Sequence, residues 1–155
     1  MIHDITKWNY FEKHVYEYIF KKTWKRIYEL ELIEETIPYY LYLLNGKYEI
    51  DILTKTGFSL SGMTKRLSQL NIRKGLEYNN IIKTTEKKID FEYDVFIDDN
   101  PQMVEDMLTQ EKKYLLLYDS PWNKSIDCSL YRNVFRVCNW NEILEKIEMI
   151  EKIWK

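Results

Sequence analysis

Short apolar runs alternate with amphipathic stretches along most of the chain, and this alternation predicts the order of its elements. The runs with the length of buried strands are residues 48–53, 80–83, 93–97, 113–118 and 135–138. The stretches with helical spacing are residues 37–44, 60–70, 103–108 and 143–154. Strands that alternate with amphipathic helices form a mainly parallel sheet covered on both faces. The pattern therefore predicts an α/β fold.

Residues with known positional preferences mark the ends of these helices. Pro38 falls in the first turn of the helix at 37–44, and Asn45-Gly46 ends it. Polar side chains can cap the later helices: Ser59 or Ser61 for the second, Asp99 or Asn100 for the third, and Asn139 or Asn141 for the last.

A further helical stripe occupies the first thirty residues. Its apolar members are Trp8, Phe11, Val15, Tyr18 and Ile19, and Asp4 or Thr6 can cap it. Two roles fit such a stripe. It can line a pocket or stack on a base, or it can pack in a core, which is the commoner role.

Composition limits the classes of function. The 155 residues are 45% hydrophobic, enough for one core, and 23 basic against 25 acidic residues leave a formal charge of -2. Because the chain has no excess of basic charge, nucleic acid is not an expected partner. Cys128 and Cys138 are too few for a disulfide scaffold and lack metal-ligand spacing. With no signal peptide and no membrane-length apolar run, the expected location is the cytoplasm, or the host cytoplasm if a phage encodes the chain.

The candidate chemistry centres on residues 93–101, where an apolar run ends in Asp98, Asp99, Asn100 and Pro101. The carboxyl edge of a parallel sheet is where such folds place their sites, although an acidic turn that caps a helix fits the same residues. The loop after Thr54 can bind an anion or form an ordinary turn. His3 and His14 have no nucleophile or acid at a useful spacing, so they are not candidate catalysts.

Taken in order, several pieces resemble the haloacid dehalogenase-like phosphatases, in particular their 5'-nucleotidase and 5'(3')-deoxyribonucleotidase group, which has bacterial and phage members. The pieces are a strand ending in Thr54, Lys88 ten positions before Asp98, Ile97-Asp98-Asp99-Asn100-Pro101, the loop at 119–123, and Arg136-Val137-Cys138-Asn139-Trp140-Asn141-Glu142-Ile143. The resemblance implies a single Rossmann-like domain over residues 1–155, with a helical cap-like segment at 1–35 and an α/β core at 36–155.

The resemblance also implies roles in Mg²⁺-dependent hydrolysis of (deoxy)nucleoside monophosphates. Thr54 binds the transferring phosphoryl oxygen, and Lys88, with Lys87 as the competing assignment, neutralises the phosphate. Asp99, with Asp98 beside it, holds Mg²⁺, a hard cation suited to carboxylate ligands. These roles are coherent because phosphoryl transfer needs charge neutralisation and positioning.

The substrate pocket implied by the resemblance includes further residues. It comprises Thr54, Lys55, Lys88, Trp122 and Asn123, with Trp122 and Asn123 on its rim. An ordinary turn at 119–123 explains the last two residues equally well.

One departure from the family is large. These phosphatases open with an apolar strand ending in Asp-x-Asp, which supplies the attacking aspartate and the general acid and base. This chain has no such segment, because Asp4 has no aspartate at the required spacing and Asp51 lies inside another strand. We therefore expect little or no phosphatase activity from the isolated chain. We also expect a gap in the sheet between the strands ending at Thr54 and Asp98.

Three explanations for the missing strand remain open. The two flanking strands have closed up in a pseudophosphatase that serves as a binding module. A second polypeptide or a swapped copy supplies the strand, since exposed strand edges invite pairing with another chain. Alternatively, the chain is a fragment whose Met1 lies downstream of the true beginning.

Overall fold

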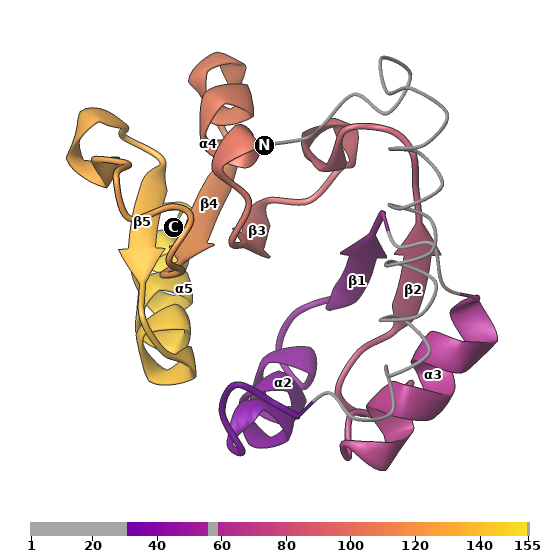
Figure 1. The fold of residues 1–155 in the computed structure, drawn as a ribbon. Coiled ribbons are helices and arrows are strands. Elements are labelled where there is room, and N and C mark those ends of the chain that lie inside the picture. Colours follow the sequence, from indigo (N-terminus) through magenta and orange to yellow (C-terminus); the bar gives the residue numbers. More distant parts are fainter. Residues whose placement is uncertain (1–30, 56–58, 155) are drawn as a thin grey trace, which may run out of the picture.

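The computed structural model describes residues 31–55 and 59–154, and its elements follow the order expected from the sequence (Figure 1). The helices are α2 (Ile37–Asn45), α3 (Leu60–Gln69), α4 (Pro101–Asp106) and α5 (Trp140–Trp154). The strands are β1 (Asp51–Thr54), β2 (Asn80–Lys83), β3 (Val95–Asp98), β4 (Tyr114–Tyr118) and β5 (Val134–Val137). Short 3₁₀ turns are η3 (Lys88–Asp90), η4 (Met107–Thr109) and η5 (Cys128–Leu130). The helix expected within the first thirty residues lies outside the described residues.

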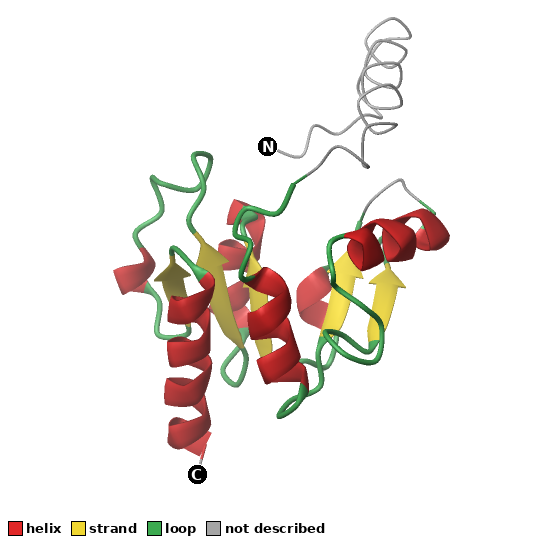
Figure 2. Ribbon diagram, turned by 90° about the horizontal axis from the view of Figure 1, so that it is seen from below, coloured by secondary structure: helices red, strands yellow, loops and turns green. Residues whose placement is uncertain are grey.

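The strands form two all-parallel sheets, one of order β1–β2 and one of order β3–β4–β5. In the view of Figure 2 the arrowheads of both sheets point the same way. The expected interruption is present, because β1 and β3 belong to different sheets. The alternative in which these two strands close up against each other is therefore wrong.

Helices cover both faces of the larger sheet, which explains why its middle strand is continuously apolar. Leu115, Leu116 and Leu117 of β4 are fully buried. On one face, Leu115 and Leu117 pack with buried residues of β3, α4, η4 and β5: Phe96, Met103, Val104, Met107 and Val134. On the other face, Leu116 packs with buried residues of α2, β5 and α5: Leu44, Val137, Ile143, Ile147 and Ile150.

Helix α2 joins the smaller sheet to the larger one. Its Leu41 packs with Ile72 and Tyr78 in a cluster that includes side chains of β1 and β2, whereas Leu44 packs against α5. At the end of α2, the Lys47 ammonium lies 2.6 Å from Glu151 of α5. The two sheets are thus connected through helices and through side chains, including the hydrogen bond from Tyr93 Oη to Asp51 (2.6 Å), and not through paired strands.

Three of the proposed helix caps can be assigned. Ser59 Oγ accepts a hydrogen bond from Gly62 N (3.1 Å) at the start of α3, and Asn100 Oδ1 accepts one from Gln102 N (3.0 Å) at the start of α4. Asn139 Oδ1 accepts from Glu142 N (2.9 Å), and the Glu142 carboxylate in turn accepts from Cys138 N (2.8 Å). Among the described helices, none has both the length and the apolar composition needed to cross a membrane.

Candidate functional site

Polar residues gather where the parallel strands end. Thr54 is the last residue of β1, Asp98 is the last of β3, and Asp119 follows β4. In the view of Figure 2 these carboxyl ends face the same way, whereas in Figure 1 the arrowheads of β1 and β2 point up and those of β4 and β5 point down, so the two sheets are strongly rotated relative to each other. The carboxyl edge is the one at which open α/β sheets bind their ligands.

A lysine–aspartate pair occupies the end of β3. The turn η3 places Lys88 so that its Nζ lies 2.5 Å from Asp98 Oδ2, and the two side chains are only 23% and 10% exposed. The other oxygen of Asp98 accepts a hydrogen bond from Asn100 N (2.9 Å). Lys87 instead pairs with Asp106 at 2.7 Å. Of the two candidate lysines, Lys88 is therefore the one that reaches the end of β3.

The backbone of Asp99 is held by side chains of the loop that follows β4. Its carbonyl oxygen accepts hydrogen bonds from Trp122 Nε1 (3.2 Å) and Asn123 Nδ2 (3.0 Å). Burial raises the pKa of the Asp99 carboxyl group above its ordinary value, and the neighbouring charge of Asp98 raises it further. A positive group bound beside these two carboxylates would favour the ionised form of Asp99.

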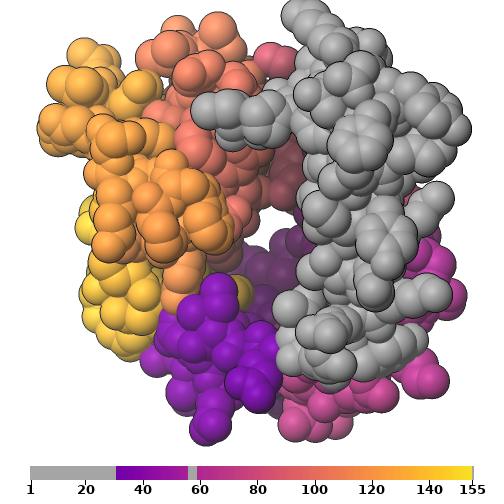
Figure 3. Space-filling model, viewed as in Figure 1, coloured from indigo at the N-terminus to yellow at the C-terminus, as the bar shows by residue number. Residues whose placement is uncertain are grey.

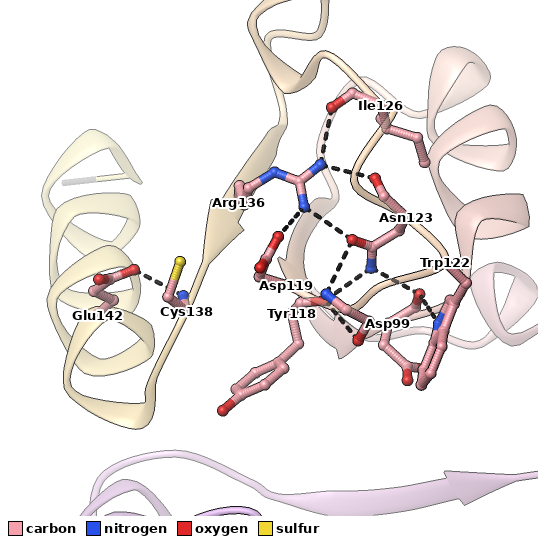
Figure 4. A network of polar contacts seen from close by, with 10 residues as sticks. Asp99, Tyr118, Asp119, Trp122, Asn123, Ile126, Arg136, Cys138 and Glu142 are labelled. Carbon is pink, nitrogen blue, oxygen red and sulfur yellow. Dashed lines mark hydrogen bonds and ion pairs between the residues drawn. The ribbon is translucent and has the colours of Figure 1, made fainter.

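Asn123 connects the ends of β3 and β4 (Figure 4). Its side chain is fully buried, and Nδ2 donates to Tyr118 O (2.8 Å) as well as to Asp99 O. Its Oδ1 accepts from Ser120 N (3.2 Å) and Arg136 Nη1 (2.8 Å). The amide is thus engaged at every donor and acceptor position, and its role here is to position the loop.

Arg136 completes this network from β5. Its Nη1 lies 2.6 Å from Asp119 Oδ1, and its Nη2 donates to the carbonyl oxygens of Asn123 and Ile126, both at 2.9 Å (Figure 4). Neither Arg136 nor Asp119 is among the site residues expected from the sequence. The available signal was a charged residue inside an otherwise apolar strand, which requires buried partners.

The remaining expected site residues have different settings. Thr54 and the exposed Lys55 belong to the β1–β2 side, and the Thr54 carbonyl oxygen accepts a hydrogen bond from Thr84 N (2.9 Å). Trp122 is 62% exposed beside Asp99, so its ring is accessible to a ligand. The structure thus brings Lys88, Asp98, Asp99, Trp122 and Asn123 together at the end of β3.

The described residues contain no preformed cluster of three or more histidine, cysteine, aspartate or glutamate side chains arranged to hold a metal ion. Asp98 and Asp99 supply two adjacent carboxylates, and Asp98 is already bonded to Lys88. Mg²⁺ usually keeps several waters and is held by one or two carboxylates together with substrate phosphates, so a role for Asp98 and Asp99 in holding it stays a prediction.

Replacing Asp99 with asparagine should alter the pH dependence of stability. A carboxyl group whose pKa is higher in the folded than in the unfolded state weakens the fold as pH rises above the ordinary value of 3.8. Asp99→Asn removes this penalty. Urea unfolding should therefore show a larger gain in unfolding free energy, relative to the unaltered chain, at about pH 7 than at about pH 3.

Asp127→Asn is a matched control with the opposite sign. Hydrogen bonds from the Ser129 hydroxyl and backbone N lower the pKa of Asp127. This variant should lose more stability at about pH 7 than at about pH 3. The same sign of pH effect at both positions would contradict the assigned environment of Asp99.

Comparison with known proteins adds no family assignment. No protein-family model, no curated protein and no solved structure matches the chain. What the geometry establishes is an α/β fold of two small parallel sheets with helices alongside.

Proposed function

We propose that the chain is a phosphate-binding module related to the haloacid dehalogenase-like nucleotidases and catalytically incomplete without a further carboxylate. One observation supports this proposal above the others. Lys88, Asp98 and Asp99 meet at the carboxyl end of β3, and Thr54 lies at the carboxyl end of β1. Their order along the chain is the order found in these phosphatases.

Lys88 carries the affinity for phosphate in this proposal. An ammonium group that is only 23% exposed interacts more strongly with an anion than a fully solvated one. Asp98 competes for the same ammonium at 2.5 Å, so phosphate has to share or displace that partner. The Thr54 hydroxyl provides a second contact to a phosphoryl oxygen. We expect weak binding, with a dissociation constant of about 1 mM, equivalent to about −4 kcal/mol.

Hydrolysis requires a nucleophile as well as a binding site. Three carboxylates at this edge are committed to bonds within the protein: Asp98 to Lys88, Asp119 to Arg136, and Glu34 to the Tyr118 hydroxyl (2.7 Å). A positioned lysine and threonine lower the barrier for phosphoryl transfer but do not replace the group that attacks phosphorus. Nucleoside monophosphates are therefore ligands and not substrates of the isolated chain.

The expected result is binding without turnover. In NMR titrations, inorganic phosphate or dUMP at up to ~10 mM, about ten times the expected dissociation constant, should shift the resonances of Lys88 and its neighbours. The same preparation should release no phosphate from dUMP, dTMP or an aryl phosphate at saturating Mg²⁺. Lys88→Met should abolish the shifts because the cation is lost.

Lys87→Met is the matched control, because Lys87 pairs with Asp106 away from the end of β3. It should leave the titration unchanged. Titrations without any shift, or shifts equally sensitive to both lysines, would dispose of the phosphate site. Robust turnover abolished by Asp99→Asn would instead show that the chain is a complete enzyme.

A second candidate is an enzyme subunit in which another chain supplies the Asp-x-Asp strand. The separation of β1 from β3 favours it, because a strand could enter between them. It predicts phosphatase activity in a complex isolated from the native source and loss of that activity when this chain is purified away. Equal inactivity of the complex and the chain would contradict it.

A further inference from the structure

The edges of the two sheets face each other across a groove. β1 and β3 are both edge strands, and a groove with a volume of about 390 Å³ lies between residues 48–50, which lead into β1, and residues 92–97, which lead into and form part of β3. Figure 3 shows the molecule hollowed near its centre, beside the segments that carry these two strands. Side chains from both sides and from α5 line the groove, including Ile50, Val95, Ile97 and Ile150.

Backbone groups of β3 point into this groove. The Asp94 carbonyl oxygen accepts a hydrogen bond from Tyr114 N (2.8 Å), so the backbone of Asp94 faces β4. Successive residues of a strand point their backbone groups to alternate sides. The N–H and C=O groups of Val95 and Ile97 therefore face away from β4 and towards β1.

The same reasoning applies to β1. The carbonyl oxygens of Ile50 and Thr54 accept hydrogen bonds from Asn79 N (2.7 Å) and Thr84 N (2.9 Å), so these residues face β2. The N–H and C=O groups of Asp51 and Leu53 consequently point away from β2, and Tyr93 Oη, from just before β3, donates a hydrogen bond to the Asp51 side chain (2.6 Å). Rows of backbone groups at two facing edges form a template for an added strand.

The side chains of the groove are apolar along its middle. Ile97 is 37% exposed although its register partner on β4, Leu116, is fully buried. Strands of parallel sheets are normally covered on both faces, so an exposed isoleucine in such a strand marks uncovered surface. Ile147 and Ile150 of α5 line the same face.

The amino-terminal end of the groove is acidic. Glu49 precedes β1, Glu92 and Asp94 precede β3, and Glu151 lies on α5. The described residues that line this groove include no lysine, arginine or histidine, but Glu151 already pairs with Lys47 at 2.6 Å, so the attraction for a basic flank comes from Glu49, Glu92 and Asp94. A segment lying parallel to β1 and β3 would bring its own amino-terminal flank to these carboxylates, which favour a basic flank.

We propose that this groove binds an extended segment of another polypeptide as a parallel strand between β1 and β3. The segment is apolar over the length of the strands and carries lysine or arginine immediately before them. Its backbone bonds to Asp51 and Leu53 on one side and to Val95 and Ile97 on the other. The inference rests on the two sheet edges and their charge, and it holds whether or not phosphate binds at Lys88.

The probe is a fluorescein-labelled peptide, Lys-Lys-Thr-Val-Ile-Val-Thr, titrated with the full chain. Fluorescence anisotropy should show saturable binding. Methylation of alternate peptide nitrogens should weaken binding at least about tenfold, the scale of a lost hydrogen bond. The peptide Thr-Val-Ile-Val-Thr-Lys-Lys should also bind at least about tenfold more weakly, because its charges sit at the wrong end.

Variants locate the site. Ile97→Asp should weaken binding at least about tenfold by placing a charge on the apolar wall. Leu130→Asp, at a 77% exposed residue outside the groove, should have no effect. The double variant Glu49→Lys, Glu92→Lys should bind the lysine-flanked peptide more weakly than the unaltered chain does. It should bind a peptide flanked by glutamates more tightly. Glu148→Lys, on the exposed side of α5, should leave the affinity for both peptides unchanged.

Several results would overturn the proposal. One is the absence of saturable binding to the full chain. Another is binding that is indifferent to nitrogen methylation, to Ile97→Asp and to charge reversal. Slow amide exchange at Leu53, Val95 and Ile97 without peptide would show that this chain already fills the groove. A dimer in sedimentation analysis that Ile97→Asp dissociates would identify that occupant as a second copy.

Discussion

Replacing Asn123 with leucine should lower the free energy of unfolding by about 4 kcal/mol, because a lost hydrogen bond costs ~0.5–1.5 kcal/mol and a buried donor left without a partner costs ~1–3 kcal/mol. The substitution keeps the volume but removes four hydrogen bonds at once. Ser120 N loses its partner, and Arg136 loses one acceptor. The carbonyl oxygens of Asp99 and Tyr118 each lose one of two donors and keep Trp122 Nε1 and Ser120 Oγ respectively. Urea denaturation followed by circular dichroism measures the change.

Asn141→Leu is the matched control. Asn141 lies on the exposed surface of α5, where its amide bonds to Tyr40 and Glu145 at positions open to water. This variant should change stability by less than about 0.5 kcal/mol. If the Asn123 variant were equally mild, the loop after β4 would not depend on that amide, and the positioning role assigned to Asn123 would be wrong.

The role of Asn123 illustrates what the sequence alone conveys. The residues at 119–123 indicate a loop, which is present, and they left open whether Asn123 shapes a pocket rim or folds a turn. The contact that decides its setting comes from Arg136, thirteen residues further along the chain. Hydrophobic periodicity reports which face of an element is buried, but it does not report which polar side chains meet across a loop.

Local signals predicted the helices and strands well because each is encoded within a few residues. The boundaries were predicted less well: β1 begins only at Asp51 in the run at 48–53, and β3 begins only at Val95 in the run at 93–97. Tyr48 and Ile50 instead pack against the cluster that contains α5. A tertiary contact thus uses apolar residues that the pattern had assigned to the strand.

The arrangement of the strands was predictable only in part. Alternating elements predicted parallel pairing, and the missing Asp-x-Asp strand predicted an interruption between the ends at Thr54 and Asp98. Whether the flanking strands would close up was left open, because closure depends on how α2 and α5 hold the two sheets. The acidic amino-terminal end of the groove was also not predicted, since Glu49, Glu92 and Glu151 are far apart in the sequence and meet only in the fold.

Within the site, the family resemblance identified the candidate residues, and the structure shows how they are arranged. It named Lys88, Asp98 and Asp99 with Lys87 as an alternative, and the structure brings Lys88 to the end of β3. Their roles in phosphate binding stay predictions. Arg136 was noted only as part of the tail that resembles the family, although its charge inside an apolar strand also indicated buried partners, and Asp119 was noted only as part of the loop at 119–123.

Truncation of Leu116 to alanine should lower the free energy of unfolding by about 3–4 kcal/mol, within the range of ~2–5 kcal/mol found for buried leucines. Leu116 is fully buried in the middle strand and packs with residues of α5, including Ile143 and Ile147. These helices and strands are held by neighbours on several sides, so the cavity cannot collapse fully. Urea denaturation at constant pH measures the loss.

Ile97→Ala is the informative comparison, because Ile97 and Leu116 are register partners on adjacent strands. Ile97 is 37% exposed to the groove, so its truncation removes less buried surface and should cost only about 1 kcal/mol in the free chain. A cost equal to that of Leu116→Ala would mean that Ile97 is covered in solution, which contradicts an open groove. If the groove binds an apolar strand, the peptide should stabilise the unaltered chain more than the Ile97→Ala variant, because it then covers the full isoleucine side chain.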